Sequence, residues 1–271
     1  MSKTVLITGS TDGIGKLAAI KLLRDGHKVI LHGRNKEKLL RCVEEIKSQQ
    51  ADADIYSITG DLSRVDHIAP MVFQLLDISS NLDILVNNAG VFVSEEVTNA
   101  DGIDLRLMVN YISPFILSKA LIPILEKSKD ARIINLSSAA QESVSLEALK
   151  GEKELTTQSA YAQSKLALTM WSFHLGQVLK GIAVIALNPG SLLNTRMVQE
   201  AFGKFWSPAD KGADIIYHLC TDEKYKGLTG QYFDNDLGDP MGDFGKAHPD
   251  AYADNLVKEL IQTTHEVIES F

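Results

Sequence analysis

Short apolar runs alternate along this chain with longer segments of helical periodicity. The apolar runs, which we expect to be strands, are 4–7, 28–31, 54–58, 84–86, 132–136 and 183–187. The segments between them that show helical periodicity are 14–25, 36–49, 64–79, 102–127 and 159–179. Strands that are apolar at nearly every position are typically buried on both faces. The pattern therefore predicts an α/β fold, with a doubly wound, Rossmann-type parallel sheet of about seven strands and helices on both faces.

Two segments interrupt this alternation. Residues 139–158 are polar and charged, and residues 191–207, which follow Pro189-Gly190, carry scattered apolar side chains. No linker rich in proline, glycine or serine divides the chain, so we expect a single domain over residues 1–271. Within it we expect 191–207 to be a substrate lid and 234–271 to be a C-terminal tail.

Composition and charge narrow the classes of partner. The formal net charge of −8 argues against nucleic acid or an anionic membrane. Cys42 and Cys220 lie far apart, which is typical of reduced, buried thiols. The histidines and cysteines show no metal-ligand spacing, and the Asp-rich run 234–238 lacks the glutamate of a calcium loop, so we expect no metal. The first strand begins almost at the amino terminus and no apolar run reaches membrane-spanning length, which predicts a cytoplasmic protein.

A glycine-rich turn follows the first predicted strand. It comprises Gly9, Ser10, Thr11, Asp12, Gly13, Ile14 and Gly15. Glycines allow a tight turn and a close approach to a pyrophosphate, and the helix amino terminus beyond them offers free N–H groups. The spacing differs from the common GxGxxG pattern, so a purely structural turn is the alternative. Its position at the first strand-to-helix junction favours a nucleotide site, because doubly wound sheets bind ligands there.

The end of the second predicted strand bears on the choice of cofactor. A fold that selects NAD usually places an acid here, but this chain has Gly33 followed by Arg34 and Asn35. A guanidinium suits a 2′-phosphate, so we expect NADP(H) to be favoured over NAD(H). Two observations oppose this prediction. An arginine in a loop is commonly just solvated, and the carboxylate of Asp12 in the glycine turn would repel a phosphate.

Tyr161 and Lys165 stand four residues apart in a predicted helix and therefore share one face. A neighbouring ammonium favours the phenolate, so it lowers the pKa of the phenol. A tyrosine tuned in this way is a usable general acid or base near neutral pH. The spacing is also common by chance, so its significance depends on the other motifs.

Taken in order, the motifs resemble the short-chain dehydrogenase/reductase family over most of the chain. Besides the glycine turn and the Tyr–Lys pair, the matching residues are Asp61-Leu62, Asn87-Asn88-Ala89-Gly90, Asn110, Ser137-Ser138 and Pro189-Gly190. The resemblance implies an NAD(P)-dependent oxidoreductase acting on a small carbonyl or alcohol. It further implies that the cofactor is held by the glycine turn and by Arg34, Asn35, Asp61, Leu62, Asn88, Ala89, Gly90, Tyr161, Lys165, Pro189, Gly190, Leu193 and Thr195, with the contact to the nicotinamide amide left open between the last two.

The resemblance also implies catalytic roles. Tyr161 would exchange a proton with the substrate oxygen, and the hydroxyl of Ser138, chosen over Ser137, would hold that oxygen. Lys165 would bind the nicotinamide ribose and lower the pKa of Tyr161. Asn110 would maintain a helix kink and a water that links Lys165 to solvent. The cofactor itself would carry the hydride.

The 23-residue separation of Ser138 and Tyr161 is longer than in the simplest family members. It resembles the retinol-dehydrogenase-like branch, and we expect this protein to lack that branch's membrane anchor. Apolar side chains on the lid and before it predict a pocket for an apolar carbonyl or alcohol: Phe92, Val93, Leu192, Leu193, Met197, Val198, Phe202, Phe205 and Trp206. Simpler members dimerise through the tyrosine helix and the helix before it, so a homodimer is possible.

Two other functions stay open. A sugar-nucleotide epimerase or dehydratase uses a similar scaffold, although few residues follow the last expected strand for its larger substrate domain. A non-catalytic NADP(H)-binding sensor would typically have lost the tyrosine or the lysine. Turnover that depends on Tyr161 would separate an enzyme from a sensor.

Overall fold

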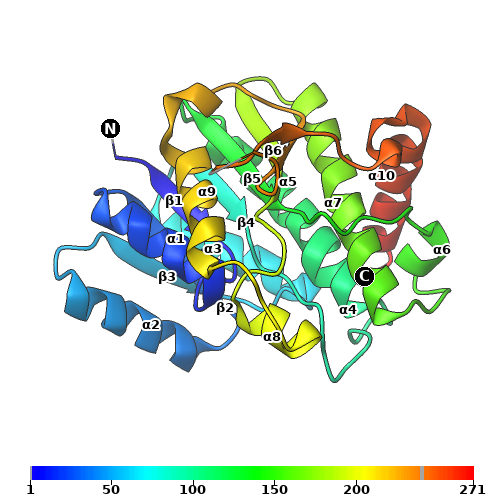
Figure 1. Cartoon of the computed structure of the whole chain (residues 1–271), viewed down its shortest axis with the longest axis horizontal. Coiled ribbons are helices and arrows are strands. Elements are labelled where there is room, and N and C mark those ends of the chain that lie inside the picture. The colour runs from blue at the N-terminus through cyan, green and yellow to red at the C-terminus, as the bar shows by residue number, and fades with distance from the viewer. Residues whose placement is uncertain (1, 239–240) are drawn as a thin grey trace.

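The computed structural model describes residues 2–238 and 241–271 and contains one eight-stranded sheet (Figure 1). Its strands are β1 (Thr4–Ile7), β2 (Lys28–Gly33), β3 (Ile55–Thr59), β4 (Ile84–Asn87), β5 (Ala131–Leu136), β6 (Ile182–Asn188), β7 (Gln231–Asp234) and β8 (Asp243–Gly245). The spatial order is β3-β2-β1-β4-β5-β6-β7-β8, and only the β7–β8 pair is antiparallel. The predicted doubly wound sheet is confirmed, with one strand more than expected.

Helices cover both faces of the sheet. One face carries α1 (Gly13–Arg24), α2 (Lys36–Gln49) and α9 (Ala209–Thr221), and the other carries α3 (Ile68–Ile78), α5 (Ser113–Leu125) and α7 (Thr157–Val178). Side chains alternate along each strand, so β1 contributes Ile7 to the core under α1 and Leu6 to the core under α3. Both positions are fully buried, which explains why the strand runs are uniformly apolar.

The helix predicted over 102–127 forms three consecutive pieces. The α-helical turn α4 (Leu105–Leu107) leads into a π-helical turn, η2 (Met108–Ile112), and then into α5. Contrary to the sequence expectation, Leu105–Leu125 is long and apolar enough to cross a membrane by length and composition. It is 67% buried inside the fold, as expected of a core helix. The π turn is a local irregularity of the kind often found at functional sites.

The expected C-terminal tail, residues 234–271, is largely regular structure packed on the fold. Residues beyond β7 form β8, the 3₁₀ turn η4 (Pro249–Tyr252) and the helix α10 (Asp254–Glu269), which stands beside α7 in Figure 1. The hydroxyl of Tyr111 lies 2.7 Å from that of Thr264 on α10, and the His265 ring meets Phe115 edge-on. The helix α10 therefore lies on the face that a homodimer through α5 and α7 would use.

The polar segment 139–158 also contains a short helix, α6 (Leu146–Leu149), whose residues Ala148 and Leu149 are buried. It packs beside α10. Residues 191–207, the expected lid, contain the short helix α8 (Arg196–Phe202). The remaining 3₁₀ turns are η1 (Val65–His67) and η3 (Glu223–Tyr225).

Candidate active site

The glycine turn lies between β1 and α1, with Gly9 at φ +63° and Gly13 at φ +54°. A side chain at Gly9 would also meet the backbone of Ala89, whose Cα lies 2.7 Å from the position of a Cβ. The Nδ2 of Asn88 donates hydrogen bonds to the carbonyls of Thr8 at 2.8 Å and Gly9 at 3.0 Å. A Cβ on Gly15 would collide with the Asn88 amide. The glycine turn and the loop after β4 are therefore packed and hydrogen-bonded together.

Ser10 was predicted to contact the cofactor, but its side chain points into the fold. It is fully buried, donates to the carbonyl of Ile7 at 2.8 Å and accepts from the N–H of His32 at 3.0 Å. The Ser10 hydroxyl already has hydrogen-bond partners at the end of β1 and on β2. It therefore stabilises the glycine turn from the side of the sheet. Thr11, by contrast, packs its methyl group against Gly33.

His32 is a residue that the sequence analysis missed. Its Nδ1 accepts a hydrogen bond from the N–H of Gly9 at 3.1 Å, and its Nε2 lies 3.0 Å from the carbonyl of Gly60. Burial lowers the pKa of His32 to about 4, so the ring is neutral at neutral pH. The neutral tautomer with hydrogen on Nε2 satisfies both contacts and holds the glycine turn in place. A histidine inside an apolar strand gave no signal of this role.

Asp12 also differs from the expectation. Its Oδ1 accepts from the N–H of Gly13 at 2.9 Å, and its Oδ2 lies 2.8 Å from the Nζ of Lys38 on α2. The hydrogen bond from Lys38 holds the pKa of Asp12 below its usual value. The carboxylate is therefore neutralised by a cation that the sequence analysis did not identify.

Arg34 and Asn35 follow β2. Arg34 is exposed, and the side chain of Asn35 caps α2 by accepting a hydrogen bond from the N–H of Lys38 at 2.9 Å.

Asp61 and Leu62 follow β3 at the same edge of the sheet. The Oδ1 of Asp61 accepts from the N–H and the hydroxyl of Ser63, at 2.9 and 2.8 Å. Leu62 is buried, and its carbonyl accepts from the hydroxyl of Ser113 at 2.6 Å. The pair stabilises this turn, and a contact of either residue with an adenine stays a prediction.

Asn110 lies in the π turn η2 and is fully buried. Its Oδ1 accepts from the N–H of Val91 at 2.8 Å, and its Nδ2 donates to the carbonyl of Val91 at 3.0 Å. The same Nδ2 donates to the hydroxyl of Ser164 at 3.0 Å, and Ser164 in turn donates to the carbonyl of Tyr161 at 2.7 Å. The amide therefore joins the loop after β4 to the turn of α7 that carries Tyr161.

Lys165 is 4% exposed, and its Nζ donates to the carbonyl of Leu136 at 2.7 Å. The Nζ lies 5.4 Å from the centre of the Tyr161 ring. Burial lowers the pKa of Lys165 to about 8, and burial raises the pKa of Tyr161, opposed by a hydrogen bond from Ser138. The pKa of Tyr161 is thus raised in this structure and not lowered as predicted, because burial of the phenol removes its hydration.

Ser138, at the end of β5, is the serine that lies beside Tyr161. Its carbonyl accepts a hydrogen bond from the hydroxyl of Tyr232 on β7 at 3.0 Å, a support that the sequence analysis missed. Ser137 instead faces the core, as expected. It is 3% exposed, donates to the carbonyl of Lys165 at 3.1 Å and lies 2.6 Å from the hydroxyl of Thr169.

The Pro189-Gly190 turn is held by Asp236, an acid of the Asp-rich run 234–238. Asp236 accepts from the N–H of Ser191 at 3.0 Å and from its hydroxyl at 2.7 Å. Within 2–238 and 241–271, no group of three or more histidine, cysteine or acidic side chains is arranged to hold a metal.

Leu193 and Thr195 were the two candidates for contacting the nicotinamide amide. Leu193 is 4% exposed and packs against Gly212. The methyl group of Thr195 instead lies 3.8 Å from the position of a Cβ on Gly13, over the glycine turn. Of the two side chains, that of Thr195 lies beside the expected cofactor site. The preceding Leu192 has φ +45°, an unusual value for a side chain of this size.

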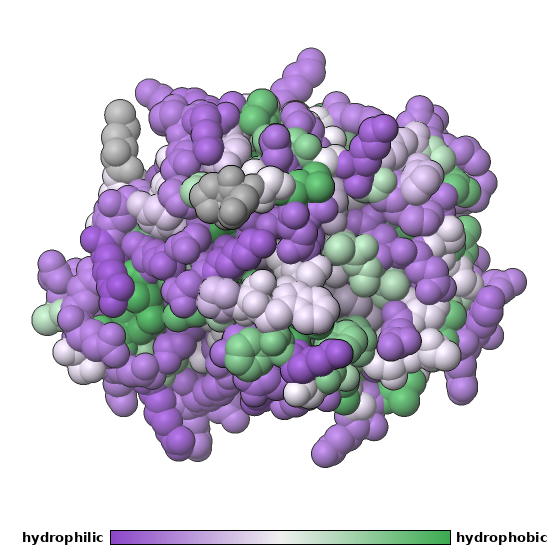
Figure 2. Space-filling model, viewed as in Figure 1, coloured by the Kyte–Doolittle hydropathy of each residue, from purple (hydrophilic) through white to green (hydrophobic). Residues whose placement is uncertain are grey.

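The lid helix α8 contributes Phe202 to an aromatic wall, and the loop after β4 contributes Phe92. The ring of Phe92 lies 4.6 Å from that of Tyr161 and 5.4 Å from that of Phe202, centre to centre. Two of the residues predicted to line an apolar pocket, Phe92 and Phe202, thus lie together beside Tyr161, and the pocket itself stays a prediction. Phe205 and Trp206 are 49% and 67% exposed, and apolar side chains gather over α8 in Figure 2.

These residues fit a dinucleotide. The turn has no room for side chains at Gly9 and Gly15, and the amino terminus of the 12-residue α1 lies directly beyond it. Lys165 places a buried cation between this turn and Tyr161, close to Gly90. The site thus offers N–H groups for phosphates at one end and acid–base groups at the other.

The sequence model described as short chain dehydrogenase matches residues 3–204. The chain belongs to the short-chain dehydrogenase family. It is 32% identical over 251 residues to retinol dehydrogenase 13 of Mus musculus, covering 86% of this chain and 75% of that protein. It is also 32% identical over 244 residues to retinol dehydrogenase 12 of Bos taurus, covering 85% and 77%. These likenesses place this short-chain dehydrogenase in the retinol-dehydrogenase-like branch.

Solved structures agree. A short-chain dehydrogenase from Shigella flexneri 2a, complexed with NADP, superposes with a TM-score of 0.70 at 26% identity, covering 87% of this chain and 97% of that one. One from Escherichia coli CFT073, complexed with NADPH, superposes with a TM-score of 0.71 at 25% identity, covering 87% and 97%. This short-chain dehydrogenase is therefore an NAD(P)-dependent oxidoreductase of alcohols or carbonyl compounds.

Proposed function

We propose that this enzyme transfers a hydride between NADP(H) and an apolar carbonyl/alcohol pair, with Tyr161 as the general acid or base. The observation that carries the proposal is the meeting of Ser138, Tyr161 and buried Lys165 at the carboxyl ends of β5 and the neighbouring strands. Burial raises the pKa of Tyr161, so the phenol keeps its proton at neutral pH. A protonated phenol can donate a proton to a carbonyl oxygen during reduction.

The roles of the side chains follow from their places. Tyr161 donates its proton to the substrate oxygen, and the hydroxyl of Ser138 holds that oxygen while negative charge develops on it. Lys165 orients the ribose of the cofactor and keeps positive charge near the phenol. Asn110 keeps the loop after β4 and α7 in register through Val91 and Ser164. The bound cofactor supplies the hydride.

The preference for NADP(H) is supported by Arg34 and by the absence of an acid at the end of β2. Two structural relatives that were solved with NADP and NADPH agree with this choice. The apolar substrate is supported by the wall of Phe92 and Phe202 beside Tyr161. A carbonyl compound with an apolar body would lie on this wall with its oxygen toward Ser138.

Tyr161→Phe tests the proposal. NADPH oxidation is followed with a panel of apolar aldehydes and ketones, and NADPH binding is titrated in parallel. We expect the variant to lose at least about 100-fold in turnover, since a positioned general acid contributes that much or more, while it binds NADPH nearly as well. Tyr56→Phe, on the exposed surface of β3, is the matched control and should retain activity. Binding without any Tyr161-dependent turnover would instead indicate a sensor.

Three properties stay predictions. The charge and composition favour a cytoplasmic enzyme with no nucleic-acid or membrane partner. A homodimer would have to use a face other than the α5–α7 surface, or displace α10 from it. Light scattering on the purified protein would decide the oligomeric state.

A further inference from the structure

An ion pair bridges the glycine turn and α2. The Oδ2 of Asp12 and the Nζ of Lys38 lie 2.8 Å apart, and their side chains are 57% and 45% exposed. The turn packs tightly against the end of β2, because the methyl carbon of Thr11 lies 2.7 Å from the position of a Cβ on Gly33. Asp12 and Lys38 therefore meet beside the end of β2, the strand that Arg34 follows, on one rim of the predicted adenosine site.

Besides Asp12, the segments that form this rim carry several basic side chains and the acidic Glu37 in the first turn of α2. Arg34 follows β2, Lys38 lies in the first turn of α2, and Arg196 at the start of α8 also helps to lower the pKa of Asp12. An ion pair this exposed adds little to stability, because water screens it and two side chains must be ordered to form it. Opening it would therefore cost little. A 2′-phosphate, with more charge and more acceptor oxygens than a carboxylate, would compete well for the ammonium.

We propose that Lys38 is a second cation for the 2′-phosphate of NADP(H), and that Asp12 tunes the cofactor preference by holding Lys38 until the phosphate takes its place. The inference rests on the proposed function and adds two residues that determine cofactor specificity. NAD(H) has a hydroxyl in place of this phosphate, so with NAD(H) bound the pair stays closed. Asp12 therefore weakens the binding of NADP(H) and leaves that of NAD(H) nearly unchanged.

Titration of NADPH and of NADH against four proteins tests this: wild type, Lys38→Gln, Asp12→Asn and the double variant. Asparagine keeps an acceptor for the N–H of Gly13, so the cap of α1 is preserved. We expect Lys38→Gln to raise the Kd for NADPH about tenfold, as for loss of one charge-assisted hydrogen bond, and to change the Kd for NADH less than about twofold. Asp12→Asn should lower the Kd for NADPH by about threefold, and this gain should vanish in the double variant.

Two further variants control for charge. Lys36→Gln removes the same charge from the same turn of α2, at an exposed position, and should leave the NADPH preference nearly intact. Lys38→Arg keeps a cation and should restore much of the NADPH affinity. Both cofactors are titrated against every variant, so a folding defect would appear as a loss of NADH binding.

The inference is overturned if Lys38→Gln and Lys36→Gln weaken NADPH binding equally. It is also overturned if Asp12→Asn strengthens NADPH binding as much without Lys38 as with it, because then only the overall charge matters. These outcomes leave the proposed function standing. If the wild-type protein binds neither cofactor, or prefers NADH, the cofactor assignment of the proposed function is wrong. That result differs from a failure of the proposal for Lys38 and Asp12 alone.

Discussion

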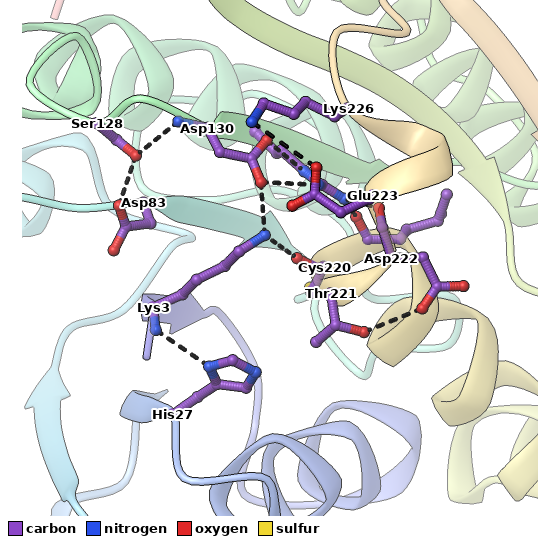
Figure 3. Close-up of polar contacts among 12 residues, drawn as sticks. Lys3, His27, Asp83, Ser128, Asp130, Cys220, Thr221, Asp222, Glu223 and Lys226 are labelled. Carbon is purple, nitrogen blue, oxygen red and sulfur yellow. Dashed lines mark hydrogen bonds and ion pairs between the residues drawn. The ribbon is translucent and has the colours of Figure 1, made fainter. Parts of the chain in front are cut away.

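Arg132→Met should strongly destabilise the fold while leaving the active site intact. Arg132 on β5 is fully buried, and its guanidinium donates two hydrogen bonds to the carboxylate of Asp130, at 3.0 and 2.8 Å. Its Nη1 also donates to the carbonyls of Leu219 at 2.7 Å and Asp222 at 3.0 Å, at the end of α9. In Figure 3, Lys3 reaches the same carboxylate and the carbonyl of Cys220.

The magnitude follows from what the substitution leaves behind. Methionine fills much of the space, but the carbonyls of Leu219 and Asp222 lose their hydrogen-bond donor. Asp130 keeps only Lys3 as a charged partner, although its side chain is just 15% exposed. Removing one partner of a buried ion pair costs about 3 to 5 kcal/mol. With a urea dependence of about 3 kcal/mol per molar for a chain of this size, the unfolding midpoint should fall by roughly 1 to 1.7 M.

Urea unfolding followed by tryptophan fluorescence measures this shift, with an unchanged slope as the sign that only stability has moved. Arg41→Met is the control, since Arg41 makes a 3.5 Å ion pair with Glu37 in which both side chains are about four-fifths exposed (79% and 83%). It should give no resolvable shift. Equal midpoints for the two variants would refute the reasoning, because the bonds of Arg132 would then only offset the cost of burying its charge. NADPH affinity of the folded Arg132→Met protein should match that of wild type.

Two further predictions concern the site itself. The pKa of His32 falls from 6.5 to about 4 on burial, so the unfolded chain takes up the extra proton first. The stability that depends on neutral His32 is complete above about pH 6.5 and is lost as the pH falls toward 4, by on the order of 3 kcal/mol. Urea midpoints over this range should fall less steeply for His32→Gln than for wild type, and parallel falls would contradict the assignment. In the lid, Phe202→Ala should raise KM for an apolar carbonyl roughly fivefold through lost apolar contact, with kcat largely kept. Phe205→Ala, outside the Phe92–Phe202 ring pair, should change neither, and an unchanged KM in Phe202→Ala would place the substrate away from α8.

Much of the site was predictable because local patterns place it. Apolar runs define the parallel strands, and the carboxyl ends of parallel strands meet at one edge, so the glycine turn, Asn88, Ser138 and the Pro189-Gly190 turn come together there. The four-residue spacing of Tyr161 and Lys165 likewise places both on α7. Such features depend on short-range periodicity and on chain order, which a sequence displays directly.

Only the tertiary structure decided which side chains are free to act. Ser10 lies in the glycine turn yet is bonded to β2, and Lys38, without a motif of its own, is brought to Asp12 from 26 residues away. Helix α10 has the apolar periodicity of a packed helix, but nothing local shows that α7 is its partner. The pKa of Tyr161 is raised because its surroundings exclude water, which depends on every segment packed around it. Long-range contacts of this kind cannot be read from any short stretch of sequence. The sequence by itself therefore determined the sheet, its helices and the candidate side chains of the site. Tertiary packing determined which residues those side chains contact and which of them are protonated.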